Sequence, residues 1–208
     1  MNLENFCLIL DDFLDPFLVD EAYSSINKKD FDPFFVKKGE VDPEKNYLYK
    51  IIHQTWIEKL KFSQEKIVGF EVWSNLMDPN NILDLHCDVD EFTEQLTGKT
   101  VHPMYTSVLY LGPKNELTGG SLRLNLKYNS HEIIKASKEI QSKLREEGEQ
   151  EEKSNQDWLT IPFKYNRLVV FDPKRPHLIT KIKDGATAEL PRIGLTMAAW
   201  DYELTILE

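Results

Sequence analysis

Short apolar runs separated by turn-forming residues fill most of the chain from Lys66 onward. They are rich in β-branched and aromatic residues, and glycine, proline, asparagine and aspartate lie between them. The runs cover residues 66–76, 103–112, 120–128, 157–163, 166–172, 177–182 and 192–204. Strands of this length at this spacing are typical of an all-β sandwich or barrel, and not of alternating βα units.

The first 65 residues follow a different pattern, which predicts a helical region leading into the strands. Asp15-Pro16 predicts the start of one helix, because aspartate caps helices and proline favours their first turn. Its apolar face is predicted to hold Phe17, Leu18 and Ala22. A second helix is predicted within residues 47–62 from the spacing of Ile51, Ile52, Trp56 and Leu60. Residues 31–46, with two Asp-Pro pairs and a glycine, are predicted to be a loop.

One strongly charged segment, residues 130–157, interrupts the predicted strands. Ile133, Ile140 and Leu144 recur at roughly heptad spacing, which predicts a short amphipathic helix running into a mobile acidic stretch at residues 146–152. The simplest interpretation is a solvated excursion between strands, and the alternative is a lid or a partner-binding arm. Residues 1–208 are expected to form a single domain, with a helical region at 1–65 and a β core at 66–208.

Composition and charge exclude several classes of protein. The chain of 208 residues is 41% hydrophobic, as ordinary globular proteins are, and its formal net charge of −10 argues against general affinity for nucleic acid or anionic membranes. Acidic residues interrupt the apolar N-terminus, so neither a signal peptide nor a membrane span is expected. Cys7 and Cys87 are not a disulfide framework, which predicts a cytoplasmic protein. The oligomeric state is not predicted.

The first candidate for chemistry is the pair His86 and Asp88, two positions apart. In an extended segment this spacing puts both side chains on one face and turns Cys87 away. A histidine and a carboxylate side by side are two thirds of the facial triad of non-haem Fe(II) oxygenases, which leaves coordination positions open for substrates. Asp90 and Glu91 are expected to lie on the surface.

The chain has five histidines in all, and a third ligand must come from the four other than His86. His53 lies in a predicted helix, His131 opens the charged segment and His102 precedes a proline in a predicted loop. His177 follows an apolar strand and a turn and opens the next strand, so it can face the same interior as His86.

Arg192 begins a strand on which Gly194, Thr196 and Ala198 share its face. A guanidinium flanked by small residues and a hydroxyl is well suited to a carboxylate, because its planar fork pairs bidentately with carboxylate oxygens. Arg192 is therefore a candidate anion-binding residue.

His86-x-Asp88, His177 and Arg192 occur in the order and rough spacing of the Fe(II)- and 2-oxoglutarate-dependent dioxygenases, and the local sequence is most similar to the prolyl 4-hydroxylase-like branch. The runs that carry the resemblance are "YTSVLYLG" with "TGGSLRL", "YNRLVVFDPKRPHLI" and "PRIGLTMAAWDY". The similarity covers about residues 66–204, and "LDDFLDPFLVDEAYSSI" resembles the usual first helix of these enzymes. It implies a double-stranded β-helix core, of the jelly-roll or cupin-like type, with N-terminal helices.

The resemblance also implies roles for individual residues. His86, Asp88 and His177 would bind Fe(II), and Arg192 would hold the 5-carboxylate of 2-oxoglutarate. Tyr110 would donate to the same carboxylate, and its alternative is a core aromatic. Thr196 is the candidate to assist Arg192, since this chain has Gly194 where other branches often have serine or threonine. The sequence does not show whether the side chains of Trp73, Asn75 and Arg123 point into the pocket.

The implied reaction consumes O2 and 2-oxoglutarate, releases succinate and CO2 and hydroxylates a C–H bond, with ascorbate as a possible stimulant. We expect the target to be a side chain in a protein, most simply prolyl, with a free amino acid or small metabolite as the alternative. Specificity is expected to reside in residues 88–104 and 130–157. A non-catalytic cupin-like binding module and a nucleic-acid demethylase are further rivals. The demethylases usually have a second arginine where this chain has Ala198, and the acidic charge disfavours them.

Overall fold

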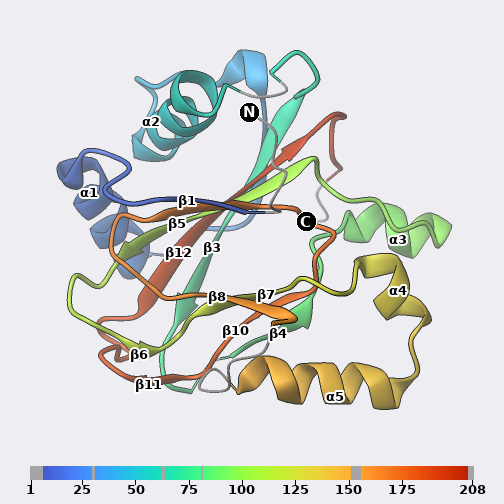
Figure 1. Cartoon of the computed structure of the whole chain (residues 1–208). Coiled ribbons are helices and arrows are strands. Elements are labelled where there is room, and N and C mark those ends of the chain that lie inside the picture. Colours follow the sequence, from blue (N-terminus) through green and yellow to red (C-terminus); the bar gives the residue numbers. More distant parts are fainter. Residues whose placement is uncertain (1–6, 30, 62–63, 81, 151–155, 206–208) are drawn as a thin grey trace.

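Two antiparallel sheets pack face to face, and helices flank them (Figure 1). The computed structural model describes residues 7–29, 31–61, 64–80, 82–150 and 156–205. The large sheet has the order β1 (Cys7–Leu10), β9 (Leu168–Phe171), β5 (Tyr105–Gly112), β12 (Arg192–Trp200), β3 (Gly69–Met77) and β2 (Phe34–Lys37). The small sheet has the order β4 (Leu83–His86), β10 (His177–Ile179), β7 (Leu122–Asn125) and β8 (Trp158–Ile161), and β11 (Ile182–Asp184) pairs with β6 (Thr118–Gly119). This arrangement confirms the predicted β core with flanking helices.

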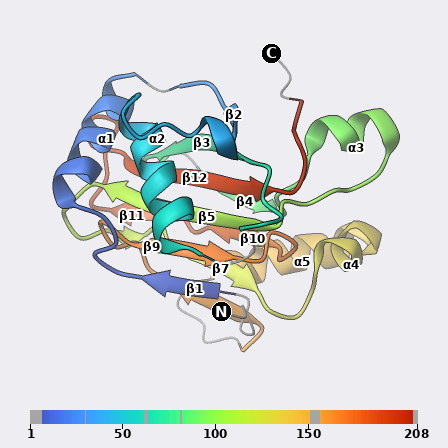
Figure 2. The same ribbon diagram turned by 90° about the horizontal axis from the view of Figure 1, so that it is seen from above.

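The N-terminal helices cover the outer face of the large sheet (Figure 2). They are α1 (Pro16–Lys28), α2 (Tyr47–Ile52) and a π-helical continuation of α2, His53–Lys59. Asp15 caps α1 as predicted, because its side chain accepts a hydrogen bond from the Phe17 amide at 2.9 Å. Phe17 itself is 83% exposed, so its placement on the apolar face was wrong. The buried stripe of α1 consists of Leu18, Val19, Ala22 and Ile26.

The predicted loop at residues 31–46 contains an edge strand. β2 pairs antiparallel with β3, and Val36 is buried against the helices. A 3₁₀ turn, Lys38–Glu40, follows it directly. The two Asp-Pro pairs flank this strand and do not interrupt it, and an edge position tolerates such neighbours. The loop prediction was therefore wrong for these residues.

The charged segment forms two helices where one was predicted, α4 (Ser130–Lys135) and α5 (Lys138–Glu149). Each begins with its own cap, Asn129 for α4 and Ser137 for α5. α5 packs on the outer face of the small sheet through Leu144, while Ile140 remains 46% exposed. The first part of the predicted mobile stretch belongs to α5, and residues 151–152 lie outside the described residues.

The side chains of each large-sheet strand alternate between two separate cores. Leu109 and Leu111 of β5 face the N-terminal helices, whereas Val108 and Tyr110 face the small sheet. The candidate site lies on this second, inward face. In the described part of the chain, no helix is both long and apolar enough to cross a membrane.

Candidate metal and co-substrate site

The two candidate histidine ligands meet across paired strands. β4 ends at His86, β10 begins at His177, and the two residues are register partners. Their ring centroids are 4.2 Å apart. Because partners across an antiparallel pair point to the same face, both imidazoles face the space between the sheets.

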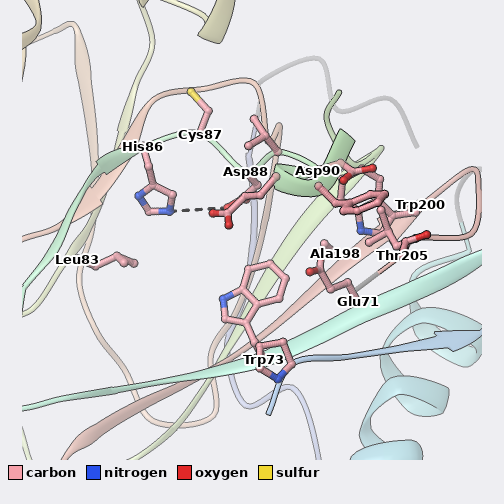
Figure 3. A pocket seen from close by; sticks show the side chains of 15 residues that line it. Glu71, Trp73, Leu83, His86, Cys87, Asp88, Asp90, Ala198, Trp200 and Thr205 are labelled. Atoms are coloured by element: carbon pink, nitrogen blue, oxygen red, sulfur yellow. Dashed lines mark ion pairs between the residues drawn. The ribbon is translucent and has the colours of Figure 1, made fainter. Parts of the chain in front are cut away.

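Asp88 completes the group with one carboxylate oxygen. Its Oδ1 lies 3.7 Å from His86 Nε2 and 3.6 Å from His177 Nε2, and the three ligand atoms lie within 4.8 Å of one another. Its Oδ2 accepts a hydrogen bond of 2.6 Å from Thr106 Oγ1 on β5. The contacts to the histidines are too long for ordinary hydrogen bonds and leave room for a shared ion. Figure 3 shows the His86–Asp88 contact.

Both histidines are held in the tautomer that a metal requires. His86 Nδ1 lies 2.7 Å from the Asp84 carbonyl and His177 Nδ1 lies 2.9 Å from the Arg175 carbonyl, so each Nδ1 carries the proton that it donates. Each Nε2 then presents its lone pair to the common point. Burial, followed by the nearby His86, lowers the pKa of His177 to about 4. His177 is therefore neutral over the physiological range.

Two residues that support Asp88 were missed from the sequence. Thr106 fixes the carboxylate, and His102 Nδ1 donates a hydrogen bond of 2.7 Å to the Asp88 carbonyl, while His102 Nε2 lies 2.7 Å from Ser130 Oγ at the start of α4. His102 thereby links the ligand backbone to α4. The alternation of β5 placed Thr106 on the same face as Tyr110, which was the only sequence signal for its role.

Arg192 and Tyr110 form a buried, incompletely satisfied polar pair. Both are 0% exposed, and the guanidinium lies 4.7 Å from the Tyr110 ring centroid. The Arg192 Nη1 contacts Met77 Sδ at 3.6 Å, but Nε, Nη2 and the Tyr110 hydroxyl have no hydrogen bond of ordinary geometry to the described residues. Burial lowers the pKa of Arg192 and raises that of Tyr110. A buried cation without a counter-ion is costly, so this pair is suited to an anionic ligand.

A narrow cavity of about 40 Å³ connects Arg192 to the histidines. Its lining includes His86, Asp88, His177, Arg192, Thr196 and Asn75. The Thr196 hydroxyl accepts a hydrogen bond of 3.3 Å from Asn75 Nδ2 and not from Arg192, so help from Thr196 to Arg192 stays a prediction. A Cβ at Gly194 would lie 3.1 Å from Val108 Cγ1 and 3.7 Å from Arg192 Nη1, so a serine or threonine there would crowd the guanidinium.

Beside the triad lies a second, larger cavity of about 510 Å³ (Figure 3). Its lining includes Glu71, Trp73, His86, Asp88, Phe92, Ala198, Trp200 and Thr205. Trp73 extends from β3 into this space (Figure 3). The N-terminus of α3 (Glu91–Thr97) contributes Glu91 and Phe92 to its rim. The cavity adjoins the candidate metal ligands and is large enough for a side chain or small substrate.

Asp90 and Glu91, both expected on the surface, differ in their exposure. Asp90 is only 6% exposed, so its surface placement was wrong: it caps α3 through the Thr93 amide and accepts a hydrogen bond of 2.7 Å from the Tyr202 hydroxyl. Glu91 is exposed as expected. Cys87 points away from the space between His86 and Asp88, as predicted (Figure 3).

Arg123 is directed out of the site. Its Nη1 donates to the Gly148 carbonyl at 3.0 Å and to the Glu147 carbonyl at 3.3 Å, at the end of α5. The guanidinium also lies 5.3 Å from the Trp158 ring centroid. Neither of the two cavities is lined by any described residue of the charged segment 130–157.

No family model matches the sequence, and no curated protein does. The structure is nevertheless similar to solved structures over nearly its whole length. A Pseudomonas putida prolyl-4-hydroxylase has a TM-score of 0.59 at 17% identity, over 95% of this chain and 86% of that one. HygX from Streptomyces hygroscopicus, solved with nickel and 2-oxoglutarate bound, has a TM-score of 0.55 at 11% identity, over 94% of this chain and 82% of that one.

A third similar structure is a prolyl hydroxylase from Trichoplax adhaerens in complex with a hypoxia inducible factor peptide fragment. Its TM-score is 0.53 at 13% identity, over 96% of this chain and 85% of that one. The fold is therefore that of the 2-oxoglutarate and Fe(II) oxygenases, and among these it is similar to the prolyl hydroxylases. The fold resemblance predicted from the sequence is confirmed.

Proposed function

We propose that this protein is an Fe(II)- and 2-oxoglutarate-dependent oxygenase that hydroxylates a C–H bond. One observation carries the proposal: two imidazole Nε2 atoms and one carboxylate oxygen converge at one end of a cavity whose other end holds a buried, unneutralised arginine. The donors at one end suit a metal ion, and the guanidinium at the other end suits a carboxylate group.

His86, Asp88 and His177 would hold the iron, and Arg192 with Tyr110 would hold the far carboxylate of 2-oxoglutarate. When bound, these groups supply the oxidation: one atom of O2 converts a substrate C–H to C–OH, and the other enters succinate as 2-oxoglutarate loses CO2. The donor set fits iron, because imidazole and carboxylate are its usual ligands in such oxygenases. O2 as co-substrate and stimulation by ascorbate are parts of this proposal.

The protein's own residues orient the metal ligands and shield the site from water. The backbone carbonyls of Asp84 and Arg175 fix the imidazole tautomers, and Thr106 leaves one oxygen of Asp88 directed at the histidines. Arg192 would neutralise the carboxylate of the co-substrate at a position closed to water, where an ion pair is stronger than at the surface. Ala198 lines the larger cavity, where its small side chain leaves space for a substrate.

We propose a side chain of a protein as the substrate, with a prolyl residue as the first candidate. Prolyl hydroxylases are among the similar folds, and one of them was solved with a peptide. The larger cavity supports a protein over a free amino acid, because no lysine or arginine lines its described part to receive an α-carboxylate. That same lining, with Glu71, Asp90 and Glu91, disfavours a phosphate backbone. A cytoplasmic location remains a prediction, in keeping with the unpaired cysteines Cys7 and Cys87.

The test is metal content and co-substrate turnover. Wild-type protein loaded with Fe(II) or Mn(II) is expected to retain about one equivalent by elemental analysis, and His177→Ala to lose it, because two ligands remain where three are needed. With peptide present, Fe(II)-loaded wild type should convert 2-oxoglutarate to succinate, and a mass gain of one oxygen should appear on the peptide. Unchanged metal occupancy in His177→Ala would refute the triad, and a metal-loaded protein that never forms succinate would support the binding-module rival.

A further inference from the structure

The inward face of the large sheet carries its charges in a fixed order. β3 and β12 are in register, so Met77 pairs with Arg192, Asn75 with Gly194, Trp73 with Thr196 and Glu71 with Ala198. The cation Arg192 thus lies at one end of the row and the carboxylate Glu71 at the other, three pairs further along. Thr106, which holds Asp88, pairs with Ala198 and so lies level with Glu71. The metal ligands therefore stand opposite the acidic end.

Glu71 differs from Asp88 and Asp90 because neither the triad nor a helix cap uses its carboxylate, and from Glu91 because Glu91 is exposed. Asp88 belongs to the triad, and Asp90 caps α3 and bonds to Tyr202. Glu71 has no ion-pair partner among the described residues, although it is only partly exposed. Trp73 and Trp200 lie at the neighbouring positions of the same inward face and also line the cavity.

We infer that the substrate presents an aliphatic cation, an ammonium or guanidinium group, to Glu71, and that this contact selects the C–H bond placed at the metal ligands. The inference rests on the proposed function, whose substrate class it narrows. A carboxylate between two indoles is suited to such a group, because indole faces attract cations and a charge-assisted hydrogen bond forms to the carboxylate. A prolyl peptide meets this requirement only if a basic residue lies near the proline.

The environment of Glu71 agrees with this role. Burial raises the pKa of Glu71 to about 7, the Trp200 indole opposes the rise, and Asp88, Asp90 and Glu91 add to it. A carboxylate held among like charges is disfavoured in its charged form until a cation arrives. No lysine or arginine lines the described part of the cavity, so apart from the metal held at Asp88 the cation has to come from the substrate.

Binding can be tested without turnover. Full-length protein, with and without Mn(II), is titrated with n-butylammonium chloride and with n-butanol, and tryptophan fluorescence is recorded because Trp73 and Trp200 line the cavity. We expect the ammonium to bind more tightly than the alcohol, and Glu71→Gln to weaken it about 10-fold or more. Glu21→Gln, an equal charge change on an exposed position of α1, should bind as wild type does. Equal ammonium affinity in wild type and Glu71→Gln overturns the inference.

Turnover then separates this inference from the proposed function. Matched peptides with proline alone, proline beside lysine, and lysine alone are compared with free lysine, by succinate formation and mass gain. We expect the lysine-containing peptides to be preferred, with KM raised about 10-fold or more by Glu71→Gln and partly restored in Glu71→Asp. Hydroxylation of the proline-only peptide with the same KM in wild type and Glu71→Gln overturns the inference and leaves the oxygenase standing. Ammonium binding through Glu71 without any succinate formation would keep the inference about the cation site and overturn the proposed oxygenase.

Discussion

Asp88 uses its two carboxylate oxygens for different tasks. Oδ1 faces the two imidazoles, while Oδ2 is held by Thr106 across the gap between the sheets. A ligand fixed in this way keeps its orientation when the metal leaves, so less order has to be created when a metal binds.

Replacing Thr106 with valine is expected to weaken metal binding about 10- to 100-fold, because the shape is kept while the hydroxyl that orients Asp88 is lost. The dissociation constant for Mn(II) is the measurement. Ser107→Ala is the matched control, since Ser107 is the next residue of β5 and bonds to the Met197 carbonyl on the opposite face. A Thr106→Val protein with wild-type affinity would show that Oδ2 needs no orienting partner.

Replacing Arg192 with alanine is expected to raise the dissociation constant of 2-oxoglutarate by roughly 30-fold or more. The reason is that a desolvated carboxylate left without its guanidinium costs about 2–5 kcal/mol. Tyr110→Phe should cost less, about 1–2 kcal/mol, because a single hydrogen bond is removed. Isothermal titration of the Mn(II)-loaded protein measures both. Wild-type affinity in Arg192→Ala would refute the anion site, and Arg145→Ala, on the exposed face of α5, is the control.

At the scale of single elements, α5 is attached to the small sheet by a buried cation. Arg123 rises from β7 to the last carbonyls of α5, where the negative end of the helix dipole favours a guanidinium. α5 packs against β4 and β10, the strands that carry both histidines. The helix therefore supports the metal-binding strands from behind.

Arg123→Met is expected to reduce the free energy of unfolding by about 2–3 kcal/mol, because the buried carbonyls lose their donor and the methionine restores only the apolar contact. Urea unfolding and amide exchange along α5 measure the effect. Arg145→Met is the matched control: Arg145 forms an exposed ion pair with Asp84 at 2.8 Å, and such pairs contribute about 1 kcal/mol or less. Similar losses in both variants would contradict a special role for Arg123.

The elements also show which parts of the structure the sequence could predict. Period-two alternation located the strands, and it put Arg192, Gly194, Thr196 and Ala198 on one face before any contact was known. The same alternation on β3 would have placed Glu71 on the inward face, but a lone carboxylate there is identified as functional only once its neighbours are known. β2 is stabilised by pairing with β3, a tertiary contact that local proline-rich sequence does not reveal. The bonds of Thr106 and His102 to Asp88 also join distant segments.

For the whole molecule, Glu71 gives the free energy of unfolding a pH dependence of definite sign. Its pKa is about 7 when folded against 4.5 as the ordinary value, mainly because of burial. Between these values the folded protein holds a proton that the unfolded chain has released. The stability contributed by that proton is present below the ordinary pKa and is lost as the pH rises through the folded pKa.

Glu71→Gln is therefore expected to stabilise the metal-free protein at about pH 8, by about 1–2 kcal/mol after allowance for partial exposure, and to change little at about pH 4. Urea unfolding at both pH values is the measurement, with Glu21→Gln as the control. A Glu71→Gln protein no more stable than wild type at the higher pH would show that the charged Glu71 carboxylate does not destabilise the protein when no ligand is bound.

The Thr106–Asp88 contact has a consequence for how the protein folds and unfolds. Both imidazoles belong to the small sheet, yet the third ligand is positioned by the large sheet, so the complete set of donors exists only after the two sheets have docked. Contacts between such distant segments form late, since closing long loops costs entropy first. We therefore expect a bound divalent ion to slow unfolding and to leave the refolding rate nearly unchanged.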